Sequence, residues 1–243
     1  MMLLDHYFET IEHLYERVRT TQRDAMIKAG KLIADAAAKG NCIHIADSGH
    51  IINAELIDRG GGLMLWRQFK YRLFTENPVR PRDRSSIDKK MTGLAEYALR
   101  ASGALPGDVI IIGSVSGKNV EVVDLAIEAK KFGMSVIVLT SLEYSKAVDA
   151  EHPSGKHLFD CGDIVIDNCA PIGDAMMDVE GLDAKLCPAS GLAGAFIMWS
   201  ITTVATEEFI KKGLTPGVYK SYNFPGGYEH NDVAQKQYRE RGY

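Results

Sequence analysis

Residues 109–140 form the most informative stretch of the chain, because an apolar run, a Ser/Gly loop, an amphipathic segment and a second apolar run follow one another there. The runs 109–112 and 136–139 are short, β-branched and uninterrupted, which is typical of strands buried on both faces. Between them the apolar residues of 120–132 recur at helical spacing, and Gly133 suits a helix C-terminus. The pattern predicts a βαβ unit in a parallel sheet.

The loop inside this unit, GSVSGKN, predicts an anion site. A loop between a parallel strand and the next helix presents backbone N–H groups and the positive end of the helix to one point. Ser114 and Ser116 add hydroxyl donors, and Gly117 lets a ligand approach the backbone. The alternative is a Ser/Gly turn that only caps the helix.

The composition describes an ordinary globular protein: 243 residues, 46% hydrophobic and 25% charged. We expect a helical extension over 1–40, a central domain over 41–215 and a C-terminal tail over 216–243. The net charge of −4 gives no general attraction to nucleic acid or to an anionic membrane, so neither is expected as a partner.

Cysteine usage and the N-terminus predict a cytoplasmic protein. The four cysteines lack CxxC spacing, which favours core thiols in a reducing compartment over a zinc site or disulfides. Charged residues stand where a signal peptide needs an apolar region, and no apolar run is long enough to span a membrane. The cysteines are Cys42, Cys161, Cys169 and Cys187.

The rest of the sequence also predicts strands and helices that follow one another along the chain. Residues 3–38 form one long or one broken amphipathic helix, and Ser48, Gly49 and His50 turn a first strand into a helix. Two prolines and several basic residues make 74–91 a long connection, either a lid or a subunit contact. The other expected strands cover 41–47, 63–66 and 163–167, and the other helices cover 51–59, 94–99 and 192–210, before a tail that ends in a short charged helix.

The loop motif resembles a known family. Ser114, Ser116, Gly117, Asn119 and Glu121 in GSVSGKNVE resemble the phosphosugar loop of the sugar isomerase (SIS) domain, S/T-x-S-G-x-S/T/N-x-E/D. The segments DSGHIINAEL, RGGGL, IDNCAPIGDA and NFPGGYEHN are similar to a single-domain, phosphoheptose-isomerase-like group. The resemblance implies a five-stranded, parallel, doubly wound sheet of flavodoxin-like order, with the first and third strands adjacent.

In such a sheet the ligand crevice lies where the strand order reverses, at the carboxyl ends of the first and third strands. The two Ser/Gly loops should meet there. We assign the phosphate of a sugar phosphate to Ser114, Ser116, the backbone of Gly117 and Lys118, and the amide of Asn119, with Ser48 and Gly49 on the opposite wall.

The resemblance also implies catalytic candidates. Aldose–ketose isomerisation through an enediol needs a base, an acid and donors for the oxyanion. Glu55 falls where related isomerases keep an acid/base glutamate; the alternative is a solvated helix residue. His50 could contact a hydroxyl or cap its helix, and His230 could reach a neighbouring subunit's pocket. Asp167 and Asp174 are polar candidates or structural caps.

No metal and no cofactor are expected. The zinc-dependent heptose isomerases carry a histidine four residues before the site glutamate, where this chain has Ile51. His50 is five residues before Glu55 and lies on another side of the helix. The apolar segment 192–210 contains neither Gln nor His.

Two functions remain open, a sugar-phosphate isomerase and a non-catalytic sugar-phosphate sensor. The chain shows no DNA-binding helix-turn-helix extension, which disfavours a regulator. The apolar N-terminal helix and the aromatic tail present more apolar surface than one sheet covers, so we expect a homodimer or homotetramer. The tail aromatics are Tyr219, Tyr222, Phe224 and Tyr228.

Overall fold

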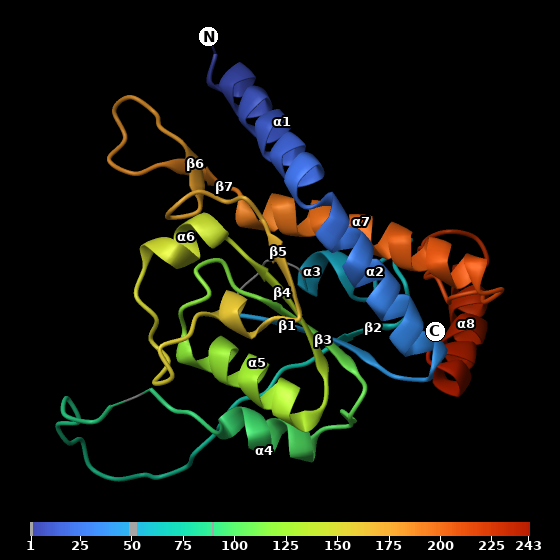
Figure 1. The fold of residues 1–243 in the computed structure, drawn as a ribbon, viewed down its shortest axis with the longest axis horizontal. Helices are drawn as coiled ribbons and strands as arrows, with labels where there is room; N and C mark the ends of the chain where they lie inside the picture. Colours follow the sequence, from blue (N-terminus) through green and yellow to red (C-terminus); the bar gives the residue numbers. More distant parts are fainter. Residues whose placement is uncertain (1, 49–52, 89) are drawn as a thin grey trace.

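A five-stranded parallel sheet forms the centre of the computed structural model, which describes residues 2–48, 53–88 and 90–243. The strand order is β2-β1-β3-β4-β5, with β1 and β3 paired in parallel (Figure 1). This is the predicted flavodoxin-like order. The strands are β1 (Ile43–Asp47), β2 (Trp66–Gln68), β3 (Val109–Gly113), β4 (Ser135–Thr140) and β5 (Ile164–Asp167).

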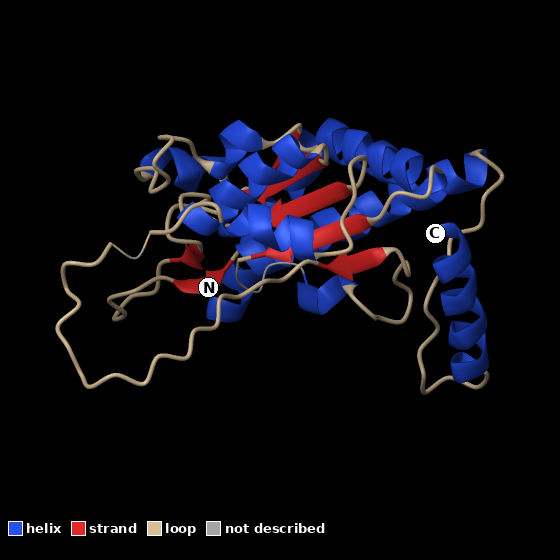
Figure 2. Cartoon of the chain, turned by 90° about the horizontal axis from the view of Figure 1, so that it is seen from below, coloured by secondary structure: helices blue, strands red, loops and turns tan. Residues whose placement is uncertain are grey.

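Helices cover both faces of the sheet (Figure 2). Alternate strand residues point to opposite faces, so Ile111 joins one buried cluster with α2 (Arg23–Ala38) and α7 (Ser190–Lys211), and Ile110 joins another with α4 (Leu94–Ala101) and α5 (Val120–Phe132). The central strand β3 is buried along its whole length, which explains its uninterrupted apolar sequence.

The βαβ unit β3-α5-β4 has the predicted boundaries. Gly133 ends α5 with a φ of 93°, and its N–H donates to the carbonyl of Lys130. Glycine adopts this left-handed conformation without the steric cost that a Cβ brings. The unit therefore places the start of α5 at the carboxyl end of β3.

The N-terminal segment is the broken form of the expected helix. α1 (Leu3–Thr21) and α2 are separated by the single residue Gln22, and Tyr15 of α1 stacks on Phe196 of α7 with ring centroids 4.8 Å apart. The N-terminal part of α1 extends beyond the sheet layers (Figure 1) and exposes Leu4 and Phe8. This helix leaves apolar surface uncovered in the single chain.

Several expected boundaries around β2 were wrong. The described helix α3 (Asn53–Leu56) ends at Leu56 rather than at residue 59, and Asp58 then turns the chain with a φ of 55°. β2 begins at Trp66 rather than at residue 63, because Leu63 forms an isolated bridge with Val218 of the tail instead. A tail residue far along the sequence therefore pairs with the chain just before β2.

Three further elements were not predicted. They are α6 (Leu142–Ala147), a 3-10 helix (Leu158–Cys161) and an antiparallel hairpin of β6 (Ala175–Met177) and β7 (Leu186–Pro188). The expected charged helix of the tail is α8 (Gly227–Arg241), which Gly226 precedes with a φ of 73°. His230 lies in this helix.

The long connection between β2 and α4 contains no helix or strand in its described part, as the sequence predicted. It leaves the body of the molecule as a wide loop (Figure 1). Within the described ranges, no helix is both long enough and apolar enough to cross a membrane. All four cysteines are free thiols.

Candidate functional site

The loop from Ser114 to Asn119 is anchored to the body of the protein through its carbonyl groups. The carbonyl of Val115 accepts hydrogen bonds from the Thr140 hydroxyl at 3.0 Å and from the Ser141 N–H at 2.9 Å. The carbonyl of Gly117 accepts the Leu158 N–H at 2.8 Å. The carbonyls of Val115 and Gly117 therefore hold the loop against β4 and the residues that follow it in the sequence.

Its donors, in contrast, are unoccupied. Among the residues that the structure describes, none accepts a hydrogen bond from the backbone N–H groups of 116–119 or from the hydroxyls of Ser114 and Ser116. Asn119 stands at the N-cap of α5, yet its side chain caps no helix N–H. These free donors lie at the positive end of a 13-residue helix, which favours an anion. In a turn that only caps α5, a side-chain oxygen would accept a helix N–H, and the Asn119 side chain accepts none.

Gly117 is required by the loop geometry. Its φ is +57°, and a Cβ at this position would lie 3.0 Å from the Thr140 hydroxyl oxygen and 3.1 Å from that of Ser145. These two hydroxyls are themselves 3.0 Å apart and buried. A larger residue would push the loop away from β4, so the glycine fixes the position of the donors.

The Lys118 ammonium group points to the segment that follows α6. Its Nζ lies 3.0 Å from Oε1 of Glu151, and this ion pair raises the pKa of Lys118 and lowers the pKa of Glu151. The charge of Lys118 is thus engaged, and its backbone N–H is the part that stays available to an anion.

A cavity of about 490 Å³ opens at the carboxyl ends of β1 and β3, beside this loop. Ser48 lines one side, its N–H donating to the Gly113 carbonyl at 3.1 Å, and Asn119 and Glu121 line another. Burial, followed by the charges of Asp124 and Glu121, raises the pKa of Tyr71 in this wall to about 12, so its hydroxyl stays protonated at neutral pH. The cavity offers both donors and acceptors to a polyhydroxylated ligand.

Another part of this cavity wall was not predicted from the sequence. Lys70, Tyr71 and Arg72 come shortly after β2, and all three line the cavity. The available signal was the pair of basic residues two positions apart, which in an extended chain face the same side. Gly49 and His50 fall outside the described residues.

Glu55 lines a different cavity. This space of about 820 Å³ lies between α1, the start of α7 and Trp199, and its wall includes Tyr7 and Tyr15. The Glu55 carboxylate is half-exposed and pairs with Arg59 at 3.4 Å. No described residue lines both this cavity and the one beside the phosphate loop. Glu55 therefore lines a separate cavity from Ser48 and Asn119.

His230 lies on α8, which packs beside the C-terminal end of α7 (Figure 1), whereas the start of α7 lines the cavity of Glu55. Its Nε2–H donates to the Val218 carbonyl at 2.9 Å, and the residue is exposed. Within one chain His230 joins neither cavity. A contribution to a neighbouring subunit's site stays a prediction.

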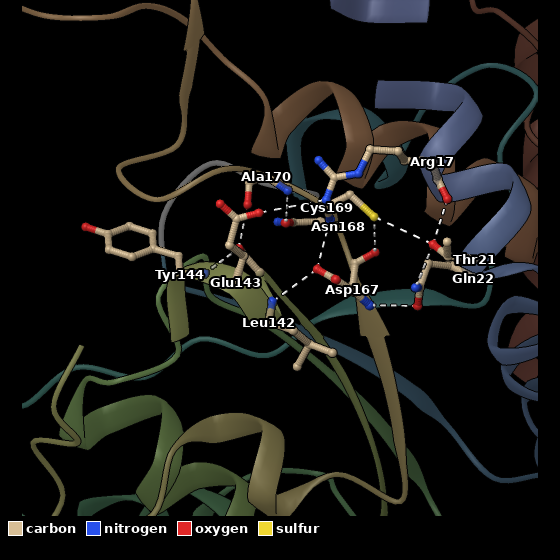
Figure 3. A network of polar contacts seen from close by, with 11 residues as sticks. Arg17, Thr21, Gln22, Leu142, Glu143, Tyr144, Asp167, Asn168, Cys169 and Ala170 are labelled. Carbon is tan, nitrogen blue, oxygen red and sulfur yellow. Dashed lines mark hydrogen bonds and ion pairs between the residues drawn. The ribbon is translucent and has the colours of Figure 1, made fainter. Parts of the chain in front are cut away.

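Asp167 has a structural role at the end of β5 (Figure 3). Its Oδ1 accepts the N–H of Leu142 at the start of α6 and the N–H of Cys169. Its own N–H donates to the side chain of Gln22 at the junction of α1 and α2. One carboxylate oxygen and the backbone N–H of Asp167 thus join β5 to α6 and to the junction of α1 and α2.

Asp174 has a similar role at α7. Its two carboxylate oxygens accept the N–H and the hydroxyl of Ser190, each at 2.8 Å. Asp174 adopts a φ of 71°, an uncommon conformation for a residue other than glycine. Asp167 and Asp174 therefore both act as structural caps, which was the alternative to a role in the site. Among the described residues, no three His, Cys, Asp or Glu side chains gather closely enough to hold a metal ion.

The sequence of this chain is similar to that of a known protein family. A sequence model of the SIS domain matches residues 6–141, which include β1, β3 and the loop 114–119. The chain belongs to the SIS domain family. It is 32% identical over 243 residues to a UPF0309 protein of Shouchella clausii, covering 99% of this chain and 98% of that one, and 33% identical over 241 residues to a UPF0309 protein of Streptomyces griseus, covering 98% and 96%.

Solved structures share the fold of this SIS protein at low sequence identity. A phosphoheptose isomerase from Francisella tularensis superimposes with a TM-score of 0.52 at 15% identity, covering 85% of this chain and all of that one. A phosphoheptose isomerase from Neisseria gonorrhoeae gives the same TM-score at 16% identity, covering 85% and 96%. These likenesses establish the SIS architecture.

Proposed function

We propose that this SIS protein binds a sugar phosphate, with the phosphate held by the loop 114–119. The observation that carries the proposal is the row of unoccupied donors at the start of α5: the N–H groups of 116–119 and the hydroxyls of Ser114 and Ser116. A phosphate with three terminal oxygens matches several convergent donors at a helix N-terminus. The fold shared with two phosphoheptose isomerases supports this ligand class.

The sugar would occupy the cavity of about 490 Å³ that Asn119 lines beside the loop. Ser48, Asp47 and Glu121 supply oxygen atoms that accept hydrogen bonds from sugar hydroxyls, and the protonated Tyr71 hydroxyl can donate one. A few polar groups in a partly apolar cavity orient a small ligand. In this proposal residues 41–215 carry the site, while 1–40 and 216–243 mediate assembly.

The proposed reaction is aldose–ketose isomerisation. A base removes the proton from the carbon beside the carbonyl, which gives an enediolate with its negative charge on the former carbonyl oxygen. A proton then passes from the neighbouring hydroxyl to that oxygen, and the base returns its proton to the former carbonyl carbon. Glu55 is the proposed base, with His50 and His230 of a neighbouring subunit as further candidates. The half-exposed carboxylate of Glu55 would have to exchange its Arg59 partner for the substrate.

A sensor is the second candidate, and a specific observation favours it. The Glu55 carboxylate lines a different cavity from Ser48 and Asn119. A protein that only binds a sugar phosphate needs the phosphate loop and its cavity, but no base next to the sugar. In that case Glu55 is a surface residue in an ion pair.

A thermal-shift panel of hexose, pentose, heptose and amino-sugar phosphates tests the binding proposal. A ligand at a hundred times its Kd adds about 2.7 kcal/mol of stability, which is a few degrees in Tm for a domain of this size. The positive ligands are then incubated in D₂O. Deuterium at the carbon beside the carbonyl supports the isomerase, and tight binding without exchange supports the sensor.

A further inference from the structure

Two cations in the wall of the phosphate-side cavity have no role in the function proposed so far. Lys70 and Arg72 both line the cavity of about 490 Å³, and both are exposed. Neither forms an ion pair with another residue in the described part of the chain, unlike Lys118, which Glu151 engages. Their charges are therefore available to a ligand.

The surrounding segment strengthens this positive charge. Residues 70–90 contain seven Lys or Arg and only three Asp or Glu, whereas the whole chain has a net charge of −4. A concentration of one sign beside a cavity with apolar walls raises the local concentration of ligands of the opposite sign. Phe69, Leu94 and Ile112 supply such apolar surface here.

The phosphate loop does not need these cations. It offers four N–H groups and two hydroxyls, which are enough for the three terminal oxygens of one phosphate. Of the loop residues, Asn119 lines the cavity, so the loop adjoins the cavity from α5 while Lys70 and Arg72 line it from the segment after β2. Asp47 and Glu121 also line the cavity, and their carboxylates suit sugar hydroxyls. The cavity lining thus combines groups that bind hydroxyls with two cations that bind a further anion.

We infer that the ligand is a sugar phosphate with a second anionic group, a carboxylate or another phosphate, which Lys70 and Arg72 bind. The inference rests on the proposed function and narrows its ligand class. The planar guanidinium of Arg72 suits either group, because it can donate two parallel hydrogen bonds to paired oxygens. Lys70 adds a point charge from the same segment of the cavity wall.

Matched ligand pairs test this inference by calorimetric titration of the full chain. Glucose 6-phosphate is compared with 6-phosphogluconate, which adds a carboxylate, and fructose 6-phosphate with fructose 1,6-bisphosphate, which adds a phosphate. We expect at least one ligand with two anionic groups to bind about tenfold more tightly than its partner with one phosphate, which is the typical effect of one added charge-assisted hydrogen-bonded contact. The pair that shows the larger ratio distinguishes a carboxylate from a second phosphate.

Variants then assign the effect to the two cations. Lys70→Gln combined with Arg72→Gln should reduce the ratio within the favoured pair to less than about threefold while the monophosphate affinity stays within about threefold. Arg82→Gln with Arg84→Gln is the control, since it removes the same charge from the same segment at residues that do not line this cavity. The control should keep the tenfold ratio.

Each of the other possible outcomes contradicts either the proposed function or the inference about a second anionic group. If the parent binds none of the four ligands and none from the thermal-shift panel, the proposed function itself fails. If the parent binds glucose 6-phosphate and fructose 6-phosphate as tightly as the ligands with two anionic groups, the inferred binding of a second anionic group is wrong and the sugar-phosphate site stands. If the Lys70 and Arg72 variant weakens both members of a pair equally, the two cations serve the single phosphate and the inference is wrong.

Discussion

Lys118 and Glu151 are joined twice, by side chains and by backbone. The ammonium and carboxylate lie 3.0 Å apart, and the Glu151 N–H donates to the Lys118 carbonyl at 3.1 Å. These two contacts attach the segment after α6 to the phosphate loop at Lys118. The side-chain pair also places a negative charge beside a loop that is suited to an anion.

Replacing that carboxylate should strengthen phosphate binding. Glu151→Gln removes a negative charge and frees the Lys118 ammonium, so sugar-phosphate affinity should rise about two- to fivefold at low salt, and less at 0.5 M salt because exposed charges are screened. The melting temperature should hardly change, since exposed ion pairs contribute little. Titrations at two salt concentrations measure both effects.

Glu128→Gln is the matched control for this variant. Glu128 pairs with Lys131 at 2.7 Å near the C-terminal end of α5, far along the helix from the loop. The same change of charge there should leave affinity unaltered. An equal gain in both variants would mean that overall charge, and not the neighbour of Lys118, controls binding.

Gly117→Ala should both destabilise the protein and weaken ligand binding. A positive φ costs a residue with a Cβ about 1–2 kcal/mol, and the contacts with Thr140 and Ser145 add about 1–3 kcal/mol of crowding. Gly155→Ala measures the cost of the positive φ without the crowding, because Gly155 has a φ of +71° and open space around its Cβ position. Urea unfolding should show a clearly larger loss for Gly117→Ala; equal losses would remove the argument that the loop packs tightly on β4.

Tyr71 should make stability depend on pH in the alkaline range. Its pKa is about 12 in the folded chain and about 10 in an unfolded one, so the stabilising effect of the protonated hydroxyl is complete below pH 10 and is lost as pH rises toward 12. The Tm of the parent should therefore fall faster than that of Tyr71→Phe between pH 10 and 12, and in parallel with it below pH 10. Parallel curves over the whole range would contradict the burial of this hydroxyl.

Strong local patterns were sufficient to predict β3, β4 and the loop between them, whereas the sheet order was predicted from the resemblance to the SIS family. Buried β-branched runs identified β3 and β4, and the Ser/Gly motif marked the loop between them. The tail could not be predicted in the same way, since the bridge of Leu63 with Val218 joins residues far apart in the sequence. Lys70 and Arg72 were missed because a segment without periodicity gives no sign of which cavity it lines. Only the folded chain shows that Glu55 lines a different cavity.

Glu55→Gln distinguishes the isomerase from the sensor. The substitution keeps the shape and removes the base, so an isomerase should lose about 10²- to 10⁴-fold in kcat with little change in ligand affinity. The assay is solvent deuterium exchange into a bound sugar phosphate, with Arg59→Gln as a control that breaks the ion pair but keeps the carboxylate. Unchanged exchange in Glu55→Gln would exclude Glu55 as the base.

The most direct test of the central claim is calorimetric titration of Ser116→Asp with a sugar phosphate that binds the parent. The aspartate places a negative charge among the free donors of the loop, at the positive end of α5. Ser116 is only partly buried, so the variant should fold and keep a Tm close to that of the parent. The account predicts that binding is lost in a folded protein. Parent-like affinity in Ser116→Asp would show that the phosphate binds elsewhere.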